Sequence, residues 1–123
     1  MEIQNNLFQN NTVKPSFGAI KYAGAESVIR KNLNLKELGE FKTLIEKEAG
    51  NPFVDLVLFK KGKKLEANIS DNIVVEGKDF RVKNYSQRFF ENSMNFIKRM
   101  VENVKKRTTQ VQEYVEKRDF KLQ

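Results

Sequence analysis

From Asn84 to the C-terminus the chain contains neither glycine nor proline, the two residues that most often end a helix. Asn84 is a good N-cap, and Gln87 follows three residues later, at the spacing of a capping box. We therefore predict a helix from about residue 85 to about residue 117. At about 1.5 Å per residue such a helix is roughly 50 Å long, whereas a compact domain of this size is roughly 30 to 35 Å across. Part of the helix must therefore overhang the domain or turn back.

The two halves of this predicted helix differ in apolar content. The first half carries a broad apolar stripe that suits a domain core, made of Phe89, Phe90, Met94, Phe96, Ile97, Met100 and Val101. The second half keeps only Val104, Val111, Tyr114 and Val115. The spacing of four and three residues also fits a coiled coil, but the flanking positions include Lys98, Lys105 and Arg107 without an acidic complement. We therefore favour packing within the chain or against an acidic partner over self-pairing.

An earlier helix is marked at both ends. Asn34 is a good N-cap, and Glu37 stands at the capping-box position. Gly50 and Pro52 supply the stop. Between these signals one face is apolar at helical spacing and consists of Leu38, Phe41, Leu44, Ile45 and Ala49. We predict a helix from about Leu35 to Ala49 that packs one side on the domain.

Residues 53–83 change to a strand-like alternation, interrupted by the pairs Gly62-Lys63 and Gly77-Lys78. A glycine in the first central position is typical of a two-residue hairpin turn. Setting Lys61 opposite Lys64 gathers one apolar face, made of Val54, Leu56, Leu58, Leu65, Ala67 and Ile69. Setting Glu76 opposite Asp79 sorts the second hairpin in the same way, with residues 70–72 as the turn between the hairpins. The pattern predicts a four-stranded antiparallel meander.

The fold class follows from these elements. Residues 1–16 are rich in Asn and Gln and predict a flexible arm. Residues 17–123 fit a single domain, in which 17–22 form a short strand and 25–32 a short helix. We predict a two-layer α+β domain, in which the helix at 35–49 and the long C-terminal helix pack on the apolar face of the meander. The other face retains an apolar patch made of Val57, Phe59 and Val74.

Composition narrows the chemistry. The chain has no histidine and no cysteine, so the commonest general base, the thiol nucleophile and the usual zinc ligands are missing. No phosphate-cradling glycine loop or other catalytic motif is present. We predict a protein without enzymatic activity, cofactor or metal. The chain has no secretory signal and no stretch near the roughly 20 apolar residues that span a bilayer, so we expect a soluble, cytoplasmic protein.

Two resemblances to known families are partial. The order of helix, strands and helix resembles the double-stranded-RNA-binding domain, but the Gly-Pro-containing loop and the basic start of the last helix are missing. Pro52 to Asp55 with Leu65 to Asn68 resembles the PD-(D/E)xK nuclease pattern, with Asn68 where that family has lysine. The predicted register places Asp55 and Glu66 about 13 Å apart, at roughly 3.3 Å per residue, which is too far to share a metal ion. A degenerate nuclease-like fold is therefore a remote alternative.

The charge distribution indicates what the protein binds. The net charge is +7, and basic residues gather at the first hairpin tip and along the last helix. The candidate contact residues are Lys60, Lys61, Lys63, Lys64, Lys98, Arg99, Lys105, Lys106, Arg107, Lys117 and Arg118. We favour a non-catalytic adaptor, a monomer or weak oligomer that holds an acidic protein surface on the helix from about Lys98 to Arg118. The alternative is nucleic-acid binding through the Lys60 to Lys64 tip and the same helix.

Overall fold

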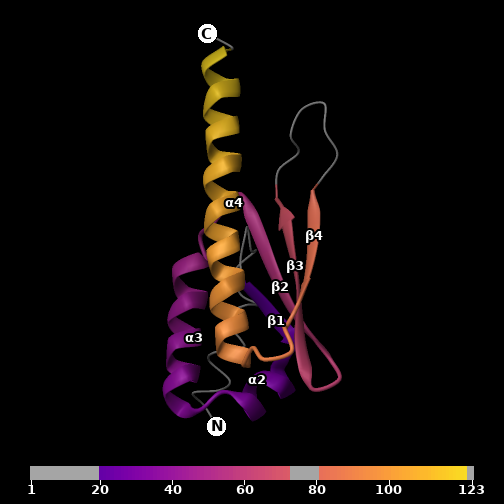
Figure 1. Cartoon of the computed structure of the whole chain (residues 1–123). Helices are drawn as coiled ribbons and strands as arrows, with labels where there is room; N and C mark the ends of the chain where they lie inside the picture. The colour runs from indigo at the N-terminus through magenta and orange to yellow at the C-terminus, as the bar shows by residue number, and fades with distance from the viewer. Residues whose placement is uncertain (1–19, 73–80, 122–123) are drawn as a thin grey trace.

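The structure is a computed structural model that describes residues 20–72 and 81–121 of the chain. Within these ranges the chain forms an α+β domain with a four-stranded mixed sheet and three helices (Figure 1). The elements are β1 (Ile20–Gly24), α2 (Glu26–Asn32), α3 (Leu35–Glu48), β2 (Val54–Lys61), β3 (Lys64–Asp71), β4 (Val82–Ser86) and α4 (Ser93–Lys121). The strands lie side by side in the order β1, β2, β3, β4. The predicted arm at residues 1–16 lies outside the described residues.

The expectation of a purely antiparallel meander is wrong. β1 pairs with β2 in parallel, whereas β2 with β3 and β3 with β4 are antiparallel. A parallel pair needs a crossover connection, and α2 and α3 provide it between β1 and β2. The short strand and the short helix predicted at 17–22 and 25–32 correspond to β1 and α2, with boundaries shifted by a few residues.

The predicted turn at residues 70–72 is also wrong. Ser70 and Asp71 belong to β3, where Ser70 pairs with Val82 of β4. The Asp71 amide donates to the Arg81 carbonyl oxygen at 2.9 Å, which carries the pairing to the end of the strand. Polar residues at the end of β3 looked like turn residues, but pairing with a distant strand overrides that local preference. The predicted second hairpin, with its Gly77-Lys78 turn, lies outside the described residues.

The first hairpin is confirmed in every paired position. Lys61 pairs with Lys64, and Leu58 pairs with Ala67. Gly62 has a φ of 65°, a conformation that glycine adopts without steric cost. The face predicted to be apolar is buried, and it comprises Val54, Leu56, Leu58, Leu65, Ala67 and Ile69. On the opposite face Val57 and Phe59 are half-buried, and Val74 lies outside the described residues.

The capping signals of α3 are confirmed. The Asn34 side chain accepts a hydrogen bond from the Glu37 amide at 2.8 Å, and the Glu37 carboxylate accepts one from the Asn34 amide at 3.0 Å. The helix ends at Glu48, just before Gly50. Phe41 and Ile45 are buried, and the Phe41 ring meets the Tyr22 ring of β1 edge to face at a centroid distance of 5.3 Å. This contact ties α3 to the sheet.

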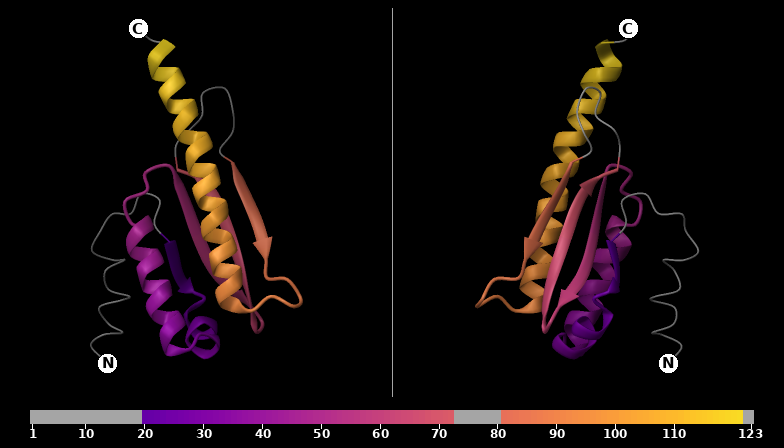
Figure 2. Two further views of the ribbon diagram at one scale, coloured as in Figure 1. Left: turned by 60° about the vertical axis from the view of Figure 1, so that its left-hand side comes forward. Right: turned by 90° about the vertical axis from the view of Figure 1, so that its right-hand side faces the viewer.

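The last helix begins later than predicted, at Ser93 rather than about residue 85. Tyr85 and Ser86 belong to β4, and Asn92 caps the helix by accepting a hydrogen bond from the Asn95 amide at 2.8 Å. Figures 1 and 2 show α3 and α4 on one face of the sheet, with α4 continuing past the ends of β2 and β3. The expected overhang is therefore confirmed.

In the described part of the chain, no helix has the length and apolarity required to cross a membrane.

Candidate binding surface

The basic residues predicted to form one surface on the last helix are divided by the fold. Most of them contact acidic side chains of the domain: Lys98 with Glu40 at 3.6 Å, Arg99 with Glu91 at 2.8 Å, Lys105 with Glu102 at 4.0 Å and Arg107 with Asp71 at 2.7 Å. Lys106 and Lys117 are exposed, and Arg118 is half-buried. The structure therefore does not bring these cations together as one patch on α4.

The loop between β4 and α4 exposes two aromatic rings. Phe89 is 79% exposed and Phe90 is 94% exposed, so the prediction that both belong to the core is wrong. Their ring centroids are 4.6 Å apart, with an angle of 74° between the ring planes. A pair of adjacent exposed rings is an unusual apolar patch on a small domain and indicates a contact surface.

This loop is fastened to the sheet by hydrogen bonds to a single residue of β3. The Leu65 amide donates to the Gln87 side-chain oxygen at 2.9 Å, and the Gln87 amide donates to the Leu65 carbonyl oxygen at 3.0 Å. The Gln87 side-chain amide also donates to the Glu91 carbonyl oxygen across the loop. These bonds fix both sides of the turn that displays the two rings.

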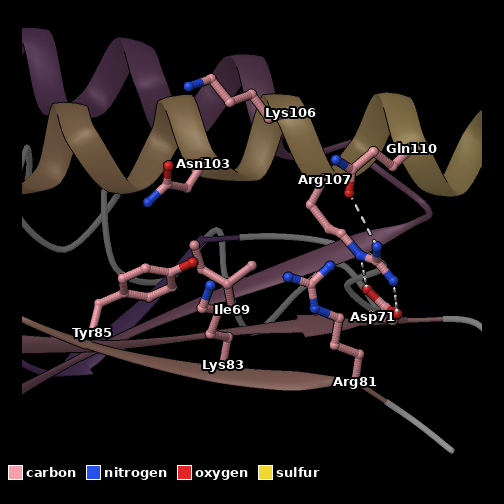
Figure 3. Close-up of a pocket in the computed structure, with 9 residues that line it drawn as sticks. All are labelled: Ile69, Asp71, Arg81, Lys83, Tyr85, Asn103, Lys106, Arg107 and Gln110. Atoms are coloured by element: carbon pink, nitrogen blue, oxygen red, sulfur yellow. Dashed lines mark hydrogen bonds and ion pairs between the residues drawn. The ribbon is translucent and has the colours of Figure 1, made fainter.

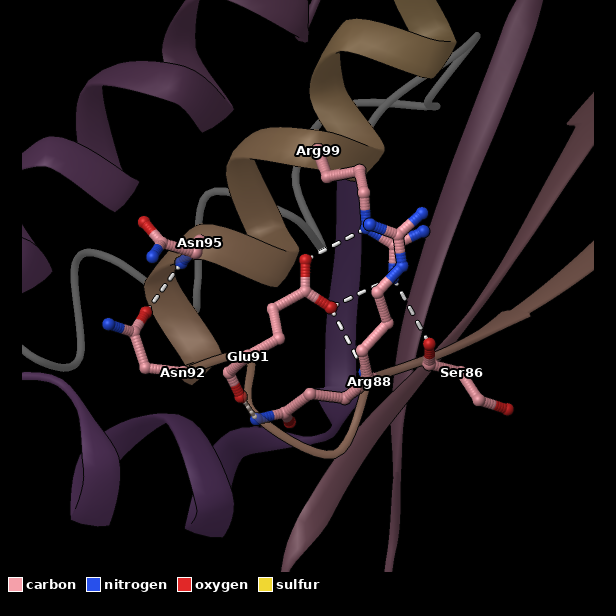
Figure 4. Close-up of polar contacts among 7 residues, drawn as sticks. Ser86, Arg88, Glu91, Asn92, Asn95 and Arg99 are labelled. Carbon is pink, nitrogen blue, oxygen red and sulfur yellow. Dashed lines mark hydrogen bonds and ion pairs between the residues drawn. The ribbon is translucent and has the colours of Figure 1, made fainter.

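A carboxylate and a guanidinium close the other side of the loop (Figure 4). Arg99 of α4 binds both oxygens of Glu91 at 2.8 Å, and its Nη2 donates to the Ser86 carbonyl oxygen at 3.1 Å. The Arg88 amide donates to the same carboxylate at 3.0 Å. The hydrogen bond from Arg99 lowers the pKa of Glu91 and correspondingly raises the pKa of Arg99, although burial opposes both shifts. The charged pair therefore connects the loop to α4.

The hairpin tip lies against this loop. Lys64 Nζ is 5.2 Å from the centroid of the Phe89 ring, a cation–π distance. The Nζ of Lys61 lies 3.7 Å from Oε2 of Glu66, and the Nζ of Lys60 donates to the Ser27 hydroxyl of α2 at 3.5 Å. We call the surface made by Lys60, Lys61, Lys63, Lys64, Arg88, Phe89 and Phe90 the aromatic-lysine tip. Sequence reasoning found its lysines and missed its two rings.

A cleft of about 120 Å³ lies between β4 and α4 (Figure 3). Its lining residues are Ile69, Asp71, Arg81, Lys83, Tyr85, Asn103, Lys106, Arg107 and Gln110. Arg107 binds both oxygens of Asp71, at 2.8 and 2.7 Å, and its Nη1 donates to the Gln110 side chain at 3.1 Å. The hydrogen bond from Asp71 raises the pKa of Arg107, against the opposing effect of burial. Lys106 and Arg107 were predicted contacts, whereas Arg81 and Lys83 were not.

The structure also bears on the nuclease-like alternative. Asp55 pairs with Ser70, and Glu66 pairs with Phe59, as the predicted register required. The two carboxylates therefore lie four residues apart along the hairpin, about 13 Å at roughly 3.3 Å per residue. Residues 20–72 and 81–121 contain no cluster of three or more acidic side chains placed to hold a metal ion.

Comparison with protein-family models, curated proteins and solved structures found no match to this chain.

Proposed function

We propose that the protein is a non-catalytic binding module that holds single-stranded nucleic acid on its aromatic-lysine tip. The observation that carries this proposal is the Phe89-Phe90 pair, displayed among lysines by a loop with hydrogen bonds on both sides. Unpaired bases stack on exposed aromatic rings, and lysines contact the phosphates that connect them. The tip combines these two kinds of contact on one end of the domain.

The two rings have different roles in this proposal. Lys64 lies over the face of Phe89, and Phe89 in turn meets Phe90 edge to face. Phe90 is the more exposed ring and offers the open platform on which a base stacks. Phe89 supports that platform and brings the Lys64 ammonium group near the phosphate of the stacked nucleotide.

The kind of cation also favours nucleic acid over a protein partner. Lysine is depleted at protein-protein interfaces, whereas aromatic residues and arginine are enriched there. The tip carries four lysines and one arginine. Its only side-chain ion pair with an acid in the described residues is that between Lys61 and Glu66. Clustered lysines suit phosphates, which they bind as compact point charges.

The direct test is fluorescence anisotropy with a labelled single-stranded oligonucleotide and a duplex of equal length. We expect the single strand to bind more tightly, with an affinity that falls steeply as salt rises. Stacking of one base contributes about 1 to 3 kcal/mol, so Phe90→Ala should weaken binding by roughly 5- to 150-fold, and Phe89→Ala by less.

The matched control is Leu35→Ala, because Leu35 is 86% exposed and begins α3 at the same end of the domain. This variant should leave the affinity unchanged. Lys64→Gln should lower the slope of log affinity against log salt by about 0.7, the value for one phosphate contact on a single strand. Equal affinities of Phe90→Ala and the wild type would rule out the stacking role.

The second candidate is the acidic protein partner favoured by the sequence, held along α4. The observation that favours it is that α4 continues past the sheet and exposes Lys106 and Lys117. Size-exclusion chromatography with light scattering, on protein prepared without nuclease, separates the two candidates. Nucleic acid that co-purifies and is released by salt supports the first candidate. Salt-tolerant binding of one protein supports the second.

The finer expectations from the sequence belong to this proposal. They are a two-layer packing of helices on sheet, a monomer or weak oligomer, a cytoplasmic location and the absence of a cofactor. The same light-scattering measurement tests the oligomeric state. None of these expectations depends on which of the two candidate partners the protein binds.

A further inference from the structure

The cleft between β4 and α4 presents cations on a sheet face that is otherwise mostly apolar. β4 pairs Lys83 with Ile69 and Tyr85 with Ala67, so both residues of β4 lie on the sheet face that α4 covers. On β1, β2 and β3 that face is made of buried apolar residues, apart from Asp71 and, at the end of β2, the exposed Lys60. A lysine on this face is not explained by core packing, and β4 is an edge strand, so Lys83 faces the cleft instead.

The cationic groups converge in this cleft. Figure 3 shows the guanidinium group of Arg81 directed toward Arg107 and Asp71, with the side chains of Lys83 and Tyr85 reaching the same space from β4. Lys83 Nζ also lies 5.7 Å from the centroid of the Tyr85 ring. Cations from two elements that approach one another repel unless an anion lies between them.

Among the described residues, one carboxylate lines the cleft, and it does not balance this charge. Asp71 is 2% exposed, and both of its oxygens are engaged by Arg107. In the part of the chain that the structure describes, Arg81, Lys83 and Lys106 form no ion pair. The Asp71 pair therefore serves to hold the Arg107 guanidinium in place, with part of its donor set still available to a ligand.

The volume of the cleft and its hydrogen-bond donors indicate which kind of ligand it can bind. The cleft has a volume of about 120 Å³, which is enough for a small tetrahedral anion. Guanidinium and ammonium donors come from the β4 side, and the Arg107 guanidinium and the Asn103 amide come from α4. A planar carboxylate uses donors in one plane, whereas a phosphate accepts hydrogen bonds from several directions.

We infer that the cleft between β4 and α4 binds a phosphate group through Arg81, Lys83 and Arg107. This site is separate from the aromatic-lysine tip and does not depend on it. The phosphate group belongs either to free inorganic phosphate or to a nucleotide, and the chemistry of recognition is the same for both.

The test is a titration of the ¹⁵N-labelled full chain with inorganic phosphate at constant ionic strength, followed by NMR. We expect saturable shifts of the backbone amides of Lys83, Tyr85, Asn103 and Gln110. Arg81→Gln and Lys83→Gln should each weaken phosphate binding at least tenfold. Both positions are exposed, so these variants should fold normally. The matched control Lys117→Gln, an exposed lysine on the same helix as Arg107, should change the affinity less than twofold.

Two results would overturn the inference. One is a set of non-saturating shifts spread over the lysines of the whole surface. The other is an unchanged affinity in Lys83→Gln. A second titration with a nucleoside monophosphate, and with the nucleoside alone, identifies the source of the phosphate. A monophosphate that binds at least tenfold more tightly than inorganic phosphate assigns the site to a nucleotide, and equal or weaker binding assigns it to the free anion.

The same variants separate this inference from the proposed function. Phe90→Ala should leave phosphate binding in the cleft unchanged while it weakens oligonucleotide binding at the tip. If phosphate fails to bind while the oligonucleotide binds through Phe90, the inference about the cleft fails alone. If phosphate binds in the cleft while no oligonucleotide binds, the proposed function fails alone.

Discussion

Two arginines of α4 each donate two hydrogen bonds to one carboxylate, but the two carboxylates belong to different parts of the molecule. Arg99 binds Glu91 and fixes the loop that displays the two rings. Arg107 binds Asp71 and fixes the end of β3 beside the cleft. The side chain of Asp71 is 3% exposed and that of Glu91 is 11% exposed. One pair is therefore chiefly part of the core, whereas the other controls the shape of a surface.

The largest effect is expected from Arg107→Met. Removing one partner of a buried ion pair leaves the other charge without compensation, which costs about 3 to 5 kcal/mol. We expect a loss of this size in the free energy of unfolding, measured with urea. Lys105→Met is the matched control, because its pair with Glu102 is exposed, and it should cost less than about 1 kcal/mol. Equal effects of the two variants would show that the burial of Asp71 has no energetic consequence.

A smaller loss of stability is expected from Arg99→Met. Hydrogen bonds to charged groups contribute about 1.5 to 3 kcal/mol, and water reaches Glu91 more easily than Asp71. This variant should, however, weaken oligonucleotide binding at the tip several-fold, because the loop loses the bonds that position Phe90. Arg107→Met, measured at a temperature where it is folded, should keep the affinity of the tip. Reversal of this pattern would contradict the division between the two arginines.

The smallest effect concerns pH. The pKa of Glu91 is lowered in the folded protein, first by its hydrogen bond from Arg99. Its contribution to stability is therefore fully present above the ordinary glutamate pKa of about 4.3 and is lost as the pH falls through the lowered value. Glu91→Gln should be less stable than the wild type by about 1 kcal/mol at pH 6, as charged hydrogen bonds exceed neutral ones.

The difference between Glu91→Gln and the wild type should shrink as the pH is lowered below about 4.3. Urea unfolding at a series of pH values between 6 and roughly 3 measures it. A difference that stays constant over this range would show that the Glu91 charge does not stabilise the folded loop.

Local signals in the sequence were sufficient for the hairpin of β2 and β3 and for α3. Alternation and a turn glycine determine the register of a hairpin, and the capping box at Asn34 involves residues three positions apart. Both kinds of signal act between residues that are close in sequence. The parallel pairing of β1 with β2 has no such signal, because it joins strands that two helices separate.

The candidate tip was only half predictable for a related reason. Phe90 falls at helical spacing with Met94 and Ile97, and Phe89 falls at helical spacing with Phe96, so periodicity alone assigns both to the buried stripe. Their exposure results from β4, which continues to Ser86 by pairing with Glu66 and delays the start of the helix. β4 itself is a mostly exposed edge strand with a weak apolar pattern. A strand that is stabilised mainly by pairing with another strand cannot be predicted from the local sequence pattern alone.

The parallel pairing of β1 also limits when β1 can join the sheet. β2 and β3 are neighbours in sequence and close as a hairpin in about 1 to 10 μs. β1 is synthesised earlier, but its template is the outer edge of β2, which leaves the ribosome only after α2 and α3. Until β2 has emerged, Ile20 and Tyr22 have no strand beside them. These two side chains, which are buried in the folded domain, are therefore exposed on the emerging chain.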